Sequence, residues 1–263
     1  MIRWFEHRQV YVPSSHMPRK ASELGRPYED VHLVTADDVR LHGWFFPAEA
    51  GSPRAHLALL VLHGNGGNIC NRLGFCEVWL SLGVNVFLFD YRGYGLSEGR
   101  PSEEGTYRDA QAAHKWVRAK GFDPQNIIAL GKSLGGGVAS ELALRESIGS
   151  LILQSTFVNI GSVGSELFPW LPVKRFHSIK YDTISKLPQI RLPLLVMHSR
   201  LDQVIGYHHG ERNFAAANAP KMFWEIFGNH TGTLAADTKA YARGLHAFLA
   251  QHVDRAPVDL KLA

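Results

Sequence analysis

The stretch 127–137, with the sequence IIALGKSLGGG, constrains the fold of this chain more than any other part of it. Its apolar start suits a strand buried on both faces, and the residues after it have helical periodicity. Between them, the pattern Gly-x-Ser-x-Gly predicts a sharp turn whose serine has a strained backbone. Gly131 and Gly135 must then be nearly bare, so that strand and helix can approach each other. The hydroxyl group of Ser133 is expected to point outward.

The pentapeptide by itself is a modest signal, because a chain with 25 glycines in 263 residues can contain Gly-x-Ser-x-Gly in an ordinary loop. A purely structural turn is therefore the alternative. The context favours chemistry, since the pattern stands between a predicted strand and a predicted helix, as an activated serine in this motif requires. We therefore take Ser133 as the candidate nucleophile.

Predicted strands and helices alternate along most of the chain, and 45% hydrophobic content is enough for a substantial core. This alternation predicts one α/β domain with a mostly parallel sheet of eight strands, helices on both faces and an antiparallel hairpin at its start. Ligand sites of such sheets gather beyond the carboxyl ends of the strands. The predicted strands are 31–35, 39–46, 57–62, 84–89, 127–130, 150–154, 193–198 and 221–227, and the predicted helices are 69–82, 102–120, 138–146, 207–218 and 233–252.

Two segments depart from this alternation. Residues 1–28 contain three prolines and no clean periodicity, which predicts an irregular N-terminal arm preceding a domain over 29–263. We expect the arm to pack on the domain, with peripheral membrane contact as the alternative. Residues 156–191 also lack regularity, and long insertions of this kind usually act as lids or binding elements. We expect a short cap over an apolar substrate, with Phe168 and Trp170 in contact with that substrate.

Charge and composition exclude several classes of protein. The net charge of +4 comes from scattered basic residues, so a nucleic-acid partner is not expected. No apolar run approaches the roughly 18 residues of a membrane span, and no signal-peptide hydrophobic region opens the chain. Cys70 and Cys76 lie too far apart on a helix for a disulfide, which suits a reducing compartment. We expect a cytoplasmic protein, or a membrane-associated one if a natural leader is missing.

A serine hydroxyl needs a general base, usually a histidine that a carboxylate orients. Of the 14 histidines, His230 is favoured because it follows the last predicted strand, at the same edge of the sheet as Ser133. His63 and His198 also follow strands, but His63 lies inside a glycine loop and His198 lies directly against its strand. We interpret both of these as structural.

The carboxylate is expected to be Asp202, which follows the penultimate predicted strand. Asp90 is the rival, since it also ends a strand. The turn after Asp90 is rich in hydrogen-bonding groups and gives it a structural use, so the geometry favours Asp202.

These residues together resemble the α/β-hydrolase superfamily, in its serine esterase and lipase branch. The resemblance rests on the turn GKSLG at 131–135, the loop HGN at 63–65, the turn DYRGYG at 90–95 and the order Ser133, Asp202, His230. It implies an α/β-hydrolase fold, a small acyl ester as substrate, and neither a metal nor an organic cofactor. It further implies an oxyanion hole formed by the backbone N–H groups of Asn65 and Leu134.

Two departures from the family pattern are visible. Many relatives have glycine where this chain has Ser199 and Asn229, so the turns beside Asp202 and His230 are expected to differ locally. Neither departure removes a reacting group.

Three other functions use the same residues or the same fold. A thioesterase acting on acylated protein or carrier would share Ser133, Asp202 and His230, and the sequence does not separate it from an esterase. A peptidase would need acidic groups for an ammonium ion, and the cap segment offers only Glu166 and Asp182. A non-catalytic binding protein is disfavoured, because all three residues needed for the chemistry are present.

Overall fold

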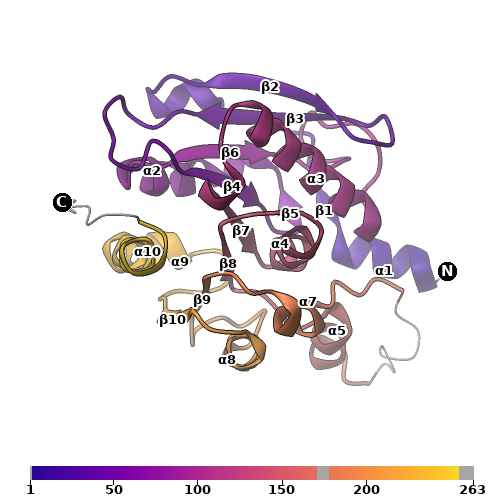
Figure 1. Ribbon diagram of the computed structural model, residues 1–263. Helices are drawn as coiled ribbons and strands as arrows, with labels where there is room; N and C mark the ends of the chain where they lie inside the picture. The colour runs from indigo at the N-terminus through magenta and orange to yellow at the C-terminus, as the bar shows by residue number, and fades with distance from the viewer. Residues whose placement is uncertain (1, 171–177, 255–263) are drawn as a thin grey trace.

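A sheet of eight strands forms the centre of the molecule (Figure 1), in the order β10-β9-β8-β7-β4-β6-β3-β2. The computed structural model describes residues 2–170 and 178–254. Strands β2 and β3 pair antiparallel, as does β3 with β6, and the other neighbours in this sheet are parallel. The predicted sheet with its hairpin is therefore confirmed, and the carboxyl ends of β4 and β6 to β10 meet at one edge.

The bounds of the elements agree with most of the predicted ranges. The strands are β1 Val12–Pro13, β2 Glu29–Val34, β3 Arg40–Phe46, β4 Ala58–Leu62, β5 Gly66–Gly67, β6 Asn85–Phe89, β7 Ile127–Lys132, β8 Ser150–Gln154, β9 Leu194–His198 and β10 Lys221–Glu225. The α-helices are α1 Ile2–Val10, α2 Leu73–Ser81, α3 Glu103–Ala119, α4 Leu134–Arg145, α5 Ile160–Leu167, α7 Thr183–Lys186, α8 Tyr207–Ala216, α9 Thr233–Ala236 and α10 Thr238–His252. Short 3-10 helices are η1 Ala21–Leu24, η2 Ile69–Arg72, η3 Pro124–Asn126 and η4 Leu187–Gln189.

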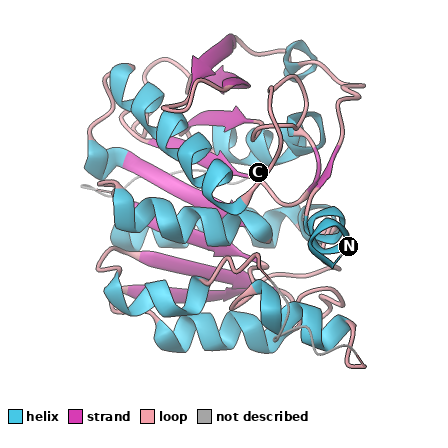
Figure 2. Ribbon diagram, turned by 90° about the vertical axis from the view of Figure 1, so that its right-hand side faces the viewer, coloured by secondary structure: helices cyan, strands magenta, loops and turns pink. Residues whose placement is uncertain are grey.

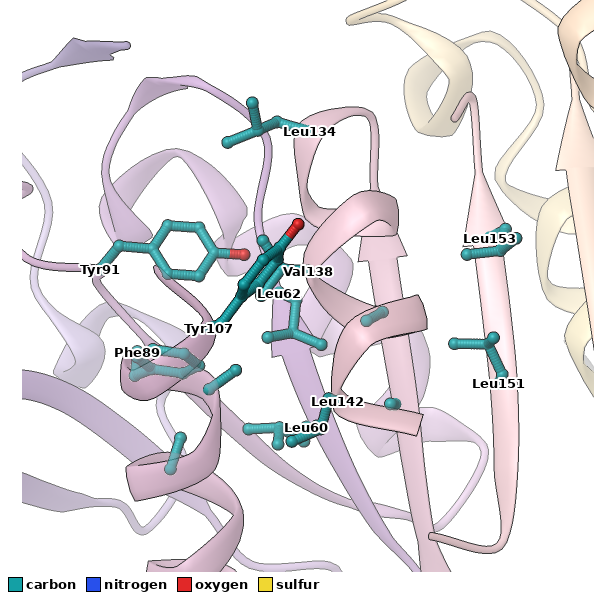
Figure 3. Close-up of a cluster of buried hydrophobic side chains, with 14 of the residues drawn as sticks. Leu60, Leu62, Phe89, Tyr91, Tyr107, Leu134, Val138, Leu142, Leu151 and Leu153 are labelled. Atoms are coloured by element: carbon teal, nitrogen blue, oxygen red, sulfur yellow. The ribbon is translucent and has the colours of Figure 1, made fainter. Parts of the chain in front are cut away.

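Both faces of the sheet are buried, because successive side chains of a strand point to opposite faces. In β4, Leu60 and Leu62 pack into one apolar cluster with α3 and α4, whereas Leu59 and Val61 pack into another with α2 and α10. Figure 1 shows these helix pairs on opposite sides of the strands, and Figure 2, turned by 90°, shows helices in front of the strands. The first cluster is drawn in Figure 3. A continuous apolar run therefore forms each central strand, as expected for a parallel sheet.

The N-terminal segment differs from its prediction. Residues 2–10 form helix α1, and the predicted irregular arm is wrong for this part. Strand β1 then pairs in parallel with β5, which lies inside the glycine loop after β4. Val10 and Tyr11 are buried, so the segment packs on the sheet domain. Pro13 can take part because a proline is tolerated in a short edge strand, where its missing N–H costs little.

The segment 156–191 is also more regular than predicted. It contains α5, α7 and η4, and its side chains Tyr181 and Leu187 are fully buried in the same cluster as α4. A Cβ atom at Gly137 of α4 would lie 2.8 Å from the Cβ atom of Tyr181, which shows how closely the segment packs. Leu171 and Pro172 of this segment lie outside the described residues.

Two further sequence predictions meet the structure here. Cys70 and Cys76 are both buried free thiols, so the predicted absence of a disulfide between them is confirmed. Within the residues that the structure describes, none of the helices combines the length and the apolar character that a bilayer crossing needs.

Candidate active site

Ser133 lies at the turn between β7 and α4, with φ of 53° and ψ of −116°. A serine with a positive φ is strained, and such strain persists only where the surroundings determine the backbone. The Ser133 N–H donates to the carbonyl of Gln154 at 2.9 Å, and its own carbonyl accepts from the N–H of Gly136 at 3.0 Å. Helix α4 begins at Leu134, directly after the turn, rather than at the predicted residue 138.

The glycines of the turn are required by close backbone approach. A Cβ atom at Gly131 would collide with the carbonyl oxygen of Gly135, and one at Gly135 would collide with that of Leu62 in β4. The prediction that both positions must be bare is therefore confirmed. Gly135 also shows that α4 begins in contact with the central strand, which places Ser133 above the middle of the sheet.

Three side chains from different loops form one hydrogen-bonded chain. His230, in the loop after β10, lies with its Nε2 3.0 Å from Ser133 Oγ. Its Nδ1 lies 2.7 Å from Oδ2 of Asp202, in the loop after β9. The structure thus brings together residues that are 97 and 28 positions apart in the sequence. They meet because the three loops leave the same edge of the sheet.

The Asp202 carboxylate is held as an acceptor. Its Oδ1 accepts the backbone N–H groups of Val204 and Ile205 at 3.0 and 2.8 Å, and its Oδ2 faces His230. Burial acts to raise the pKa of Asp202, but the hydrogen bonds from His230 and the two backbone groups outweigh it, so this pKa lies below its usual value. An ionised carboxylate accepts only, so Nδ1 of His230 carries the proton and Nε2 can accept from Ser133.

Ser199 and Asn229 each support a local turn. The Ser199 hydroxyl accepts the N–H of Leu201 at 3.1 Å, just before Asp202. The Asn229 side chain accepts the N–H of Gly232 at 2.8 Å, so that His230 lies within the turn. Ser199 and Asn229 therefore fit turns at positions where many relatives have glycine, because a short polar side chain can accept a backbone N–H within the turn.

The rival residues have other partners. His63 is buried, its Nδ1 donates to the carbonyl of Gly64, and its Nε2 lies 3.4 Å from Oδ1 of Asp90. Asp90 Oδ1 also accepts the N–H of Ile69 at 3.0 Å. His198 donates through Nε2 to the carbonyl of Ile205 at 2.9 Å, and its ring packs against Gly210 of α8. These contacts agree with the structural roles predicted for His63, His198 and Asp90.

The loop at 63–67 lies beside Ser133. A Cβ atom at Gly64 would be 3.5 Å from the Cβ atom of Ser133. Asn65 is the next residue of the loop, so it lies close to the candidate nucleophile. The carbonyl of Asn65 accepts the N–H of Val12 at 3.1 Å and the hydroxyl of Tyr94 at 2.9 Å. These bonds hold the peptide between Asn65 and Gly66, and the peptide that carries the Asn65 N–H is held by the His63 ring, whose Nδ1 donates to the carbonyl of Gly64 at 2.7 Å.

Leu134 supplies the first backbone N–H of α4, one of the donors that a helix leaves without an internal partner. This N–H adjoins Ser133 in the chain. The oxyanion hole at Leu134 and Asn65 remains a prediction, to which this placement lends support.

Phe168 and Trp170 have a less defined position. Their rings pack edge to face with centroids 5.8 Å apart, and Trp170 exposes 75% of its surface. Their contact with a substrate stays a prediction.

Glu166, His208 and His209 form a cluster of metal-ligand types, with ligand atoms within 4.8 Å of one another. The Nδ1 of His209 accepts the N–H of Val158 at 3.2 Å, so its Nε2 carries the proton and donates to Glu166 at 3.0 Å. A neutral imidazole in this arrangement has no lone pair left for a metal ion. Hydrogen bonding therefore accounts for the cluster, which ties α8 to α5.

Sequence reasoning missed two features of the site. Lys132, next to Ser133, is only 8% exposed, and burial together with the nearby Arg72 lowers the pKa of its amine to about 8. The N-terminal strand β1 holds the loop of Asn65, although it lies more than 50 residues earlier in the chain. Lys132 follows Leu130 by two positions in an apolar strand, so its side chain could have been expected on the same buried face. Only the position of α2 shows which residues surround it.

Comparisons with known proteins bear on the family and the fold of the chain. A family model described as alpha/beta hydrolase fold matches residues 58–176. The chain is similar to an uncharacterized protein of Mycobacterium tuberculosis, with 35% identity over 95% of this chain and 90% of that protein. It is also similar to the alpha/beta hydrolase domain-containing protein WAV2 of Arabidopsis thaliana, with 31% identity over 94% of this chain and 88% of the relative.

A solved structure of an esterase from Pyrococcus furiosus superimposes with a TM-score of 0.76. The match covers 93% of this chain and 98% of the esterase, at 23% sequence identity. At that identity the likeness shows the fold, and the expected α/β-hydrolase fold is confirmed.

Proposed function

We propose that this chain, which belongs to the α/β-hydrolase family, is a serine hydrolase that cleaves carboxylic esters. One observation carries the proposal: Ser133 Oγ, His230 and Asp202 form a continuous hydrogen-bonded chain at the strained turn. A serine in this arrangement can lose its proton to the imidazole as it attacks.

In the proposed mechanism, Ser133 attacks the ester carbonyl while His230 Nε2 takes the hydroxyl proton. Asp202 keeps His230 in the required tautomer and stabilises the imidazolium ion that forms. His230 then gives the proton to the departing alcohol, which leaves an acyl group on Ser133. A water molecule releases the acid by the same steps in reverse order.

The oxyanion of the tetrahedral intermediate would be bound by the backbone N–H groups of Asn65 and Leu134. Support comes from the short distance between the Asn65 loop and Ser133, and from the place of Leu134 at the start of α4. Each such donor is worth about 3 kcal/mol of transition-state stabilisation. The apolar rings of Phe168 and Trp170 are proposed to contact the acyl group.

The test is hydrolysis of p-nitrophenyl esters from acetate to palmitate by the wild type and by Ser133→Ala. We expect the wild type to turn over at least one of the esters and the variant to lose activity by a factor of about 10³ or more. The matched control is Ser81→Ala, at an exposed serine that ends α2, and this variant should retain full activity. Equal activity of Ser133→Ala and the wild type would exclude Ser133 as the nucleophile.

Asp202→Asn tests the role of the carboxylate that orients His230. The amide keeps the size of the side chain but disturbs the tautomer of His230, so kcat should fall by a factor of about 10² to 10⁴.

Labelling by a fluorophosphonate probe reports an activated serine without any choice of ester, and it would distinguish an enzyme from a non-catalytic binding protein.

The thioesterase alternative is tested by comparing butyryl ester and butyryl thioester substrates with the same protein. A preference for the thioester by more than tenfold in kcat/KM would replace the ester proposal. The peptidase alternative has lost support, because Glu166 is hydrogen bonded to His208 and His209, and Asp182 caps helix α7.

A further inference from the structure

Residues 178–181 of the cap segment, which we call the cap base, are held by two carboxylates from distant parts of the chain. Oε1 of Glu6, in α1, accepts the first two backbone N–H groups of the cap base at 2.8 and 2.9 Å, and its Oε2 accepts the Ser178 hydroxyl at 2.7 Å. Glu103, the first residue of α3, accepts the last two N–H groups at 2.7 Å each. The cap base has no regular structure, so these carboxylates satisfy N–H groups that no strand or helix would.

The cap base lies against the first turn of α4, which follows Ser133. A Cβ atom at Gly137, in this turn, would be 2.8 Å from the Cβ atom of Tyr181. Tyr181 has a φ of 35°, which is strained for a residue with a side chain. Such strain persists only where contacts determine the backbone, so the carboxylate contacts fix the cap base close to the proposed nucleophile.

Buried hydroxyl groups join the cap base to the N-terminal segment. The hydroxyl of Tyr181 lies 3.0 Å from that of Tyr11 and 2.8 Å from that of Thr106, and each of the three residues is at most 3% exposed. The Thr106 hydroxyl donates its proton to the carbonyl of Glu103. Tyr181 must therefore donate to Thr106 and accept from Tyr11, so the bond between the two tyrosines has a fixed direction.

Tyr11 also borders the peptide that supports the Asn65 loop. The Val12 N–H, which donates to the Asn65 carbonyl at 3.1 Å, belongs to the planar peptide between Tyr11 and Val12. A displacement of Tyr11 therefore moves this donor. Residues 6–12 thus run from the cap base to the Asn65 loop (Figure 1).

We propose that Glu6 and Tyr11 are positioning residues of the proposed active site, because residues 6–12 form a connector that fixes the cap base and the Asn65 loop together. When the cap base is released from the connector, the Val12 N–H no longer holds the Asn65 carbonyl in place, and the proposed oxyanion donor is less well aimed. The effect on turnover rests on the proposed ester hydrolysis, whereas the mechanical link between the two regions does not.

Hydrogen exchange followed by NMR tests the connector without a substrate. Glu6→Gln keeps the shape of the side chain but leaves one acceptor oxygen in place of two, so the amides of the cap base should exchange faster. The connector predicts that the Val12 amide, whose acceptor is Asn65, also exchanges at least about threefold faster. Glu77→Gln, at an exposed carboxylate of α2, is the matched control and should change neither. Faster exchange confined to the cap base, or unchanged exchange throughout, would overturn the proposal.

A double-mutant cycle on ester hydrolysis locates the effect at Asn65. Tyr11→Phe removes the donor to Tyr181, so kcat should fall about fivefold with little change in KM. Tyr94→Phe removes another donor to the Asn65 carbonyl, so in that background Tyr11→Phe should reduce kcat at least about threefold more than in the wild type. An equal effect of Tyr11→Phe in both backgrounds would overturn the proposal. If the wild type hydrolyses no ester, the proposed function fails, and hydrogen exchange alone decides on the connector.

Discussion

The turn at Ser133 and the loop that carries Asn65 lie side by side, yet they are held in place by opposite means. The turn is determined by its own glycines, whose missing side chains let β7, α4 and β4 approach each other. The loop is held by two distant groups, the N–H of Val12 and the hydroxyl of Tyr94, and by one nearer group, the guanidinium of Arg72. The two halves of the proposed site therefore differ in their supports: neighbouring residues determine the geometry of the turn, whereas residues far away in the sequence help to determine that of the loop.

This difference teaches where substitutions are tolerated. A residue change within the turn meets backbone atoms, which cannot move without disturbing the sheet. A change that releases the loop removes hydrogen bonds worth about 1 kcal/mol each and leaves the sheet intact. We therefore expect substitutions in the turn to abolish activity, and substitutions that release the loop to reduce activity only partly.

The largest effect is expected from Gly135→Ala. The new methyl group would collide with the carbonyl of Leu62, so the variant should lose about 3 kcal/mol of unfolding free energy and its esterase activity. Gly66→Ala in the neighbouring loop is the control, because a Cβ atom there meets nothing within 4 Å. Urea unfolding and ester hydrolysis measure both, and equal losses in the two variants would contradict the contrast between turn and loop.

A second prediction concerns Lys132, which ends the strand leading into the turn. Its pKa of about 8 in the folded chain lies below the 10.5 of an exposed lysine, so the unfolded chain binds this proton more tightly. Stability is therefore reduced by about 3 kcal/mol below pH 8, and the loss is recovered as the pH rises from 8 towards 10.5.

Lys132→Met isolates this effect, since other groups titrate in both proteins. The difference in unfolding free energy between the variant and the wild type should be greatest near pH 7 and shrink towards pH 10. Unfolding in urea at several pH values measures it. A difference that is independent of pH would show that Lys132 is not held in a desolvated environment.

Val12→Pro tests the distant support of the loop. Proline lacks the N–H that reaches the Asn65 carbonyl, so Asn65 should be less well placed and kcat should fall about tenfold with little change in KM. Val12→Ala keeps the N–H and is the matched control. If both variants lose the same activity, the exposed side chain of Val12, and not its backbone, supports the loop.

Tyr94→Phe is expected to have the smallest effect. It removes the hydroxyl donor to the same carbonyl but leaves the Val12 hydrogen bond, so kcat should fall about threefold to fivefold. Steady-state hydrolysis of the best p-nitrophenyl ester measures the change. A loss larger than that of Val12→Pro would show that the Tyr94 hydroxyl, rather than the N-terminal strand, is the main support of the loop.

Local patterns were sufficient for much of the architecture. The strands of the large sheet, its hairpin, and the turn at Ser133 follow from apolar runs and glycine positions that act over a few residues. The meeting of His230 and Asp202 with Ser133 was also predictable, because each follows a strand and parallel strands end at one edge.

Other elements could not be read from such patterns. Helix α1 has no clear apolar face of its own, and the carboxylate of Glu6 ties it to the backbone N–H groups of Ser178 and Ile179. The short helices α5 and α7 likewise depend on packing against the rest of the domain, because helices of this length are marginal alone. Their stability comes from contacts that the sequence does not place next to them.

The sequence by itself determined the turn at Ser133. A side chain at Gly131 or Gly135 would collide with backbone atoms of α4 or of the adjacent strand β4, so the two glycines are required by elements that the turn joins or touches. Only the tertiary structure decided that β1 holds the Asn65 loop and that Arg72 lies near Lys132. These arrangements join residues far apart in the chain, and the physical reason is that burial and hydrogen-bond partners are settled only when α1, β1 and α2 pack on the sheet.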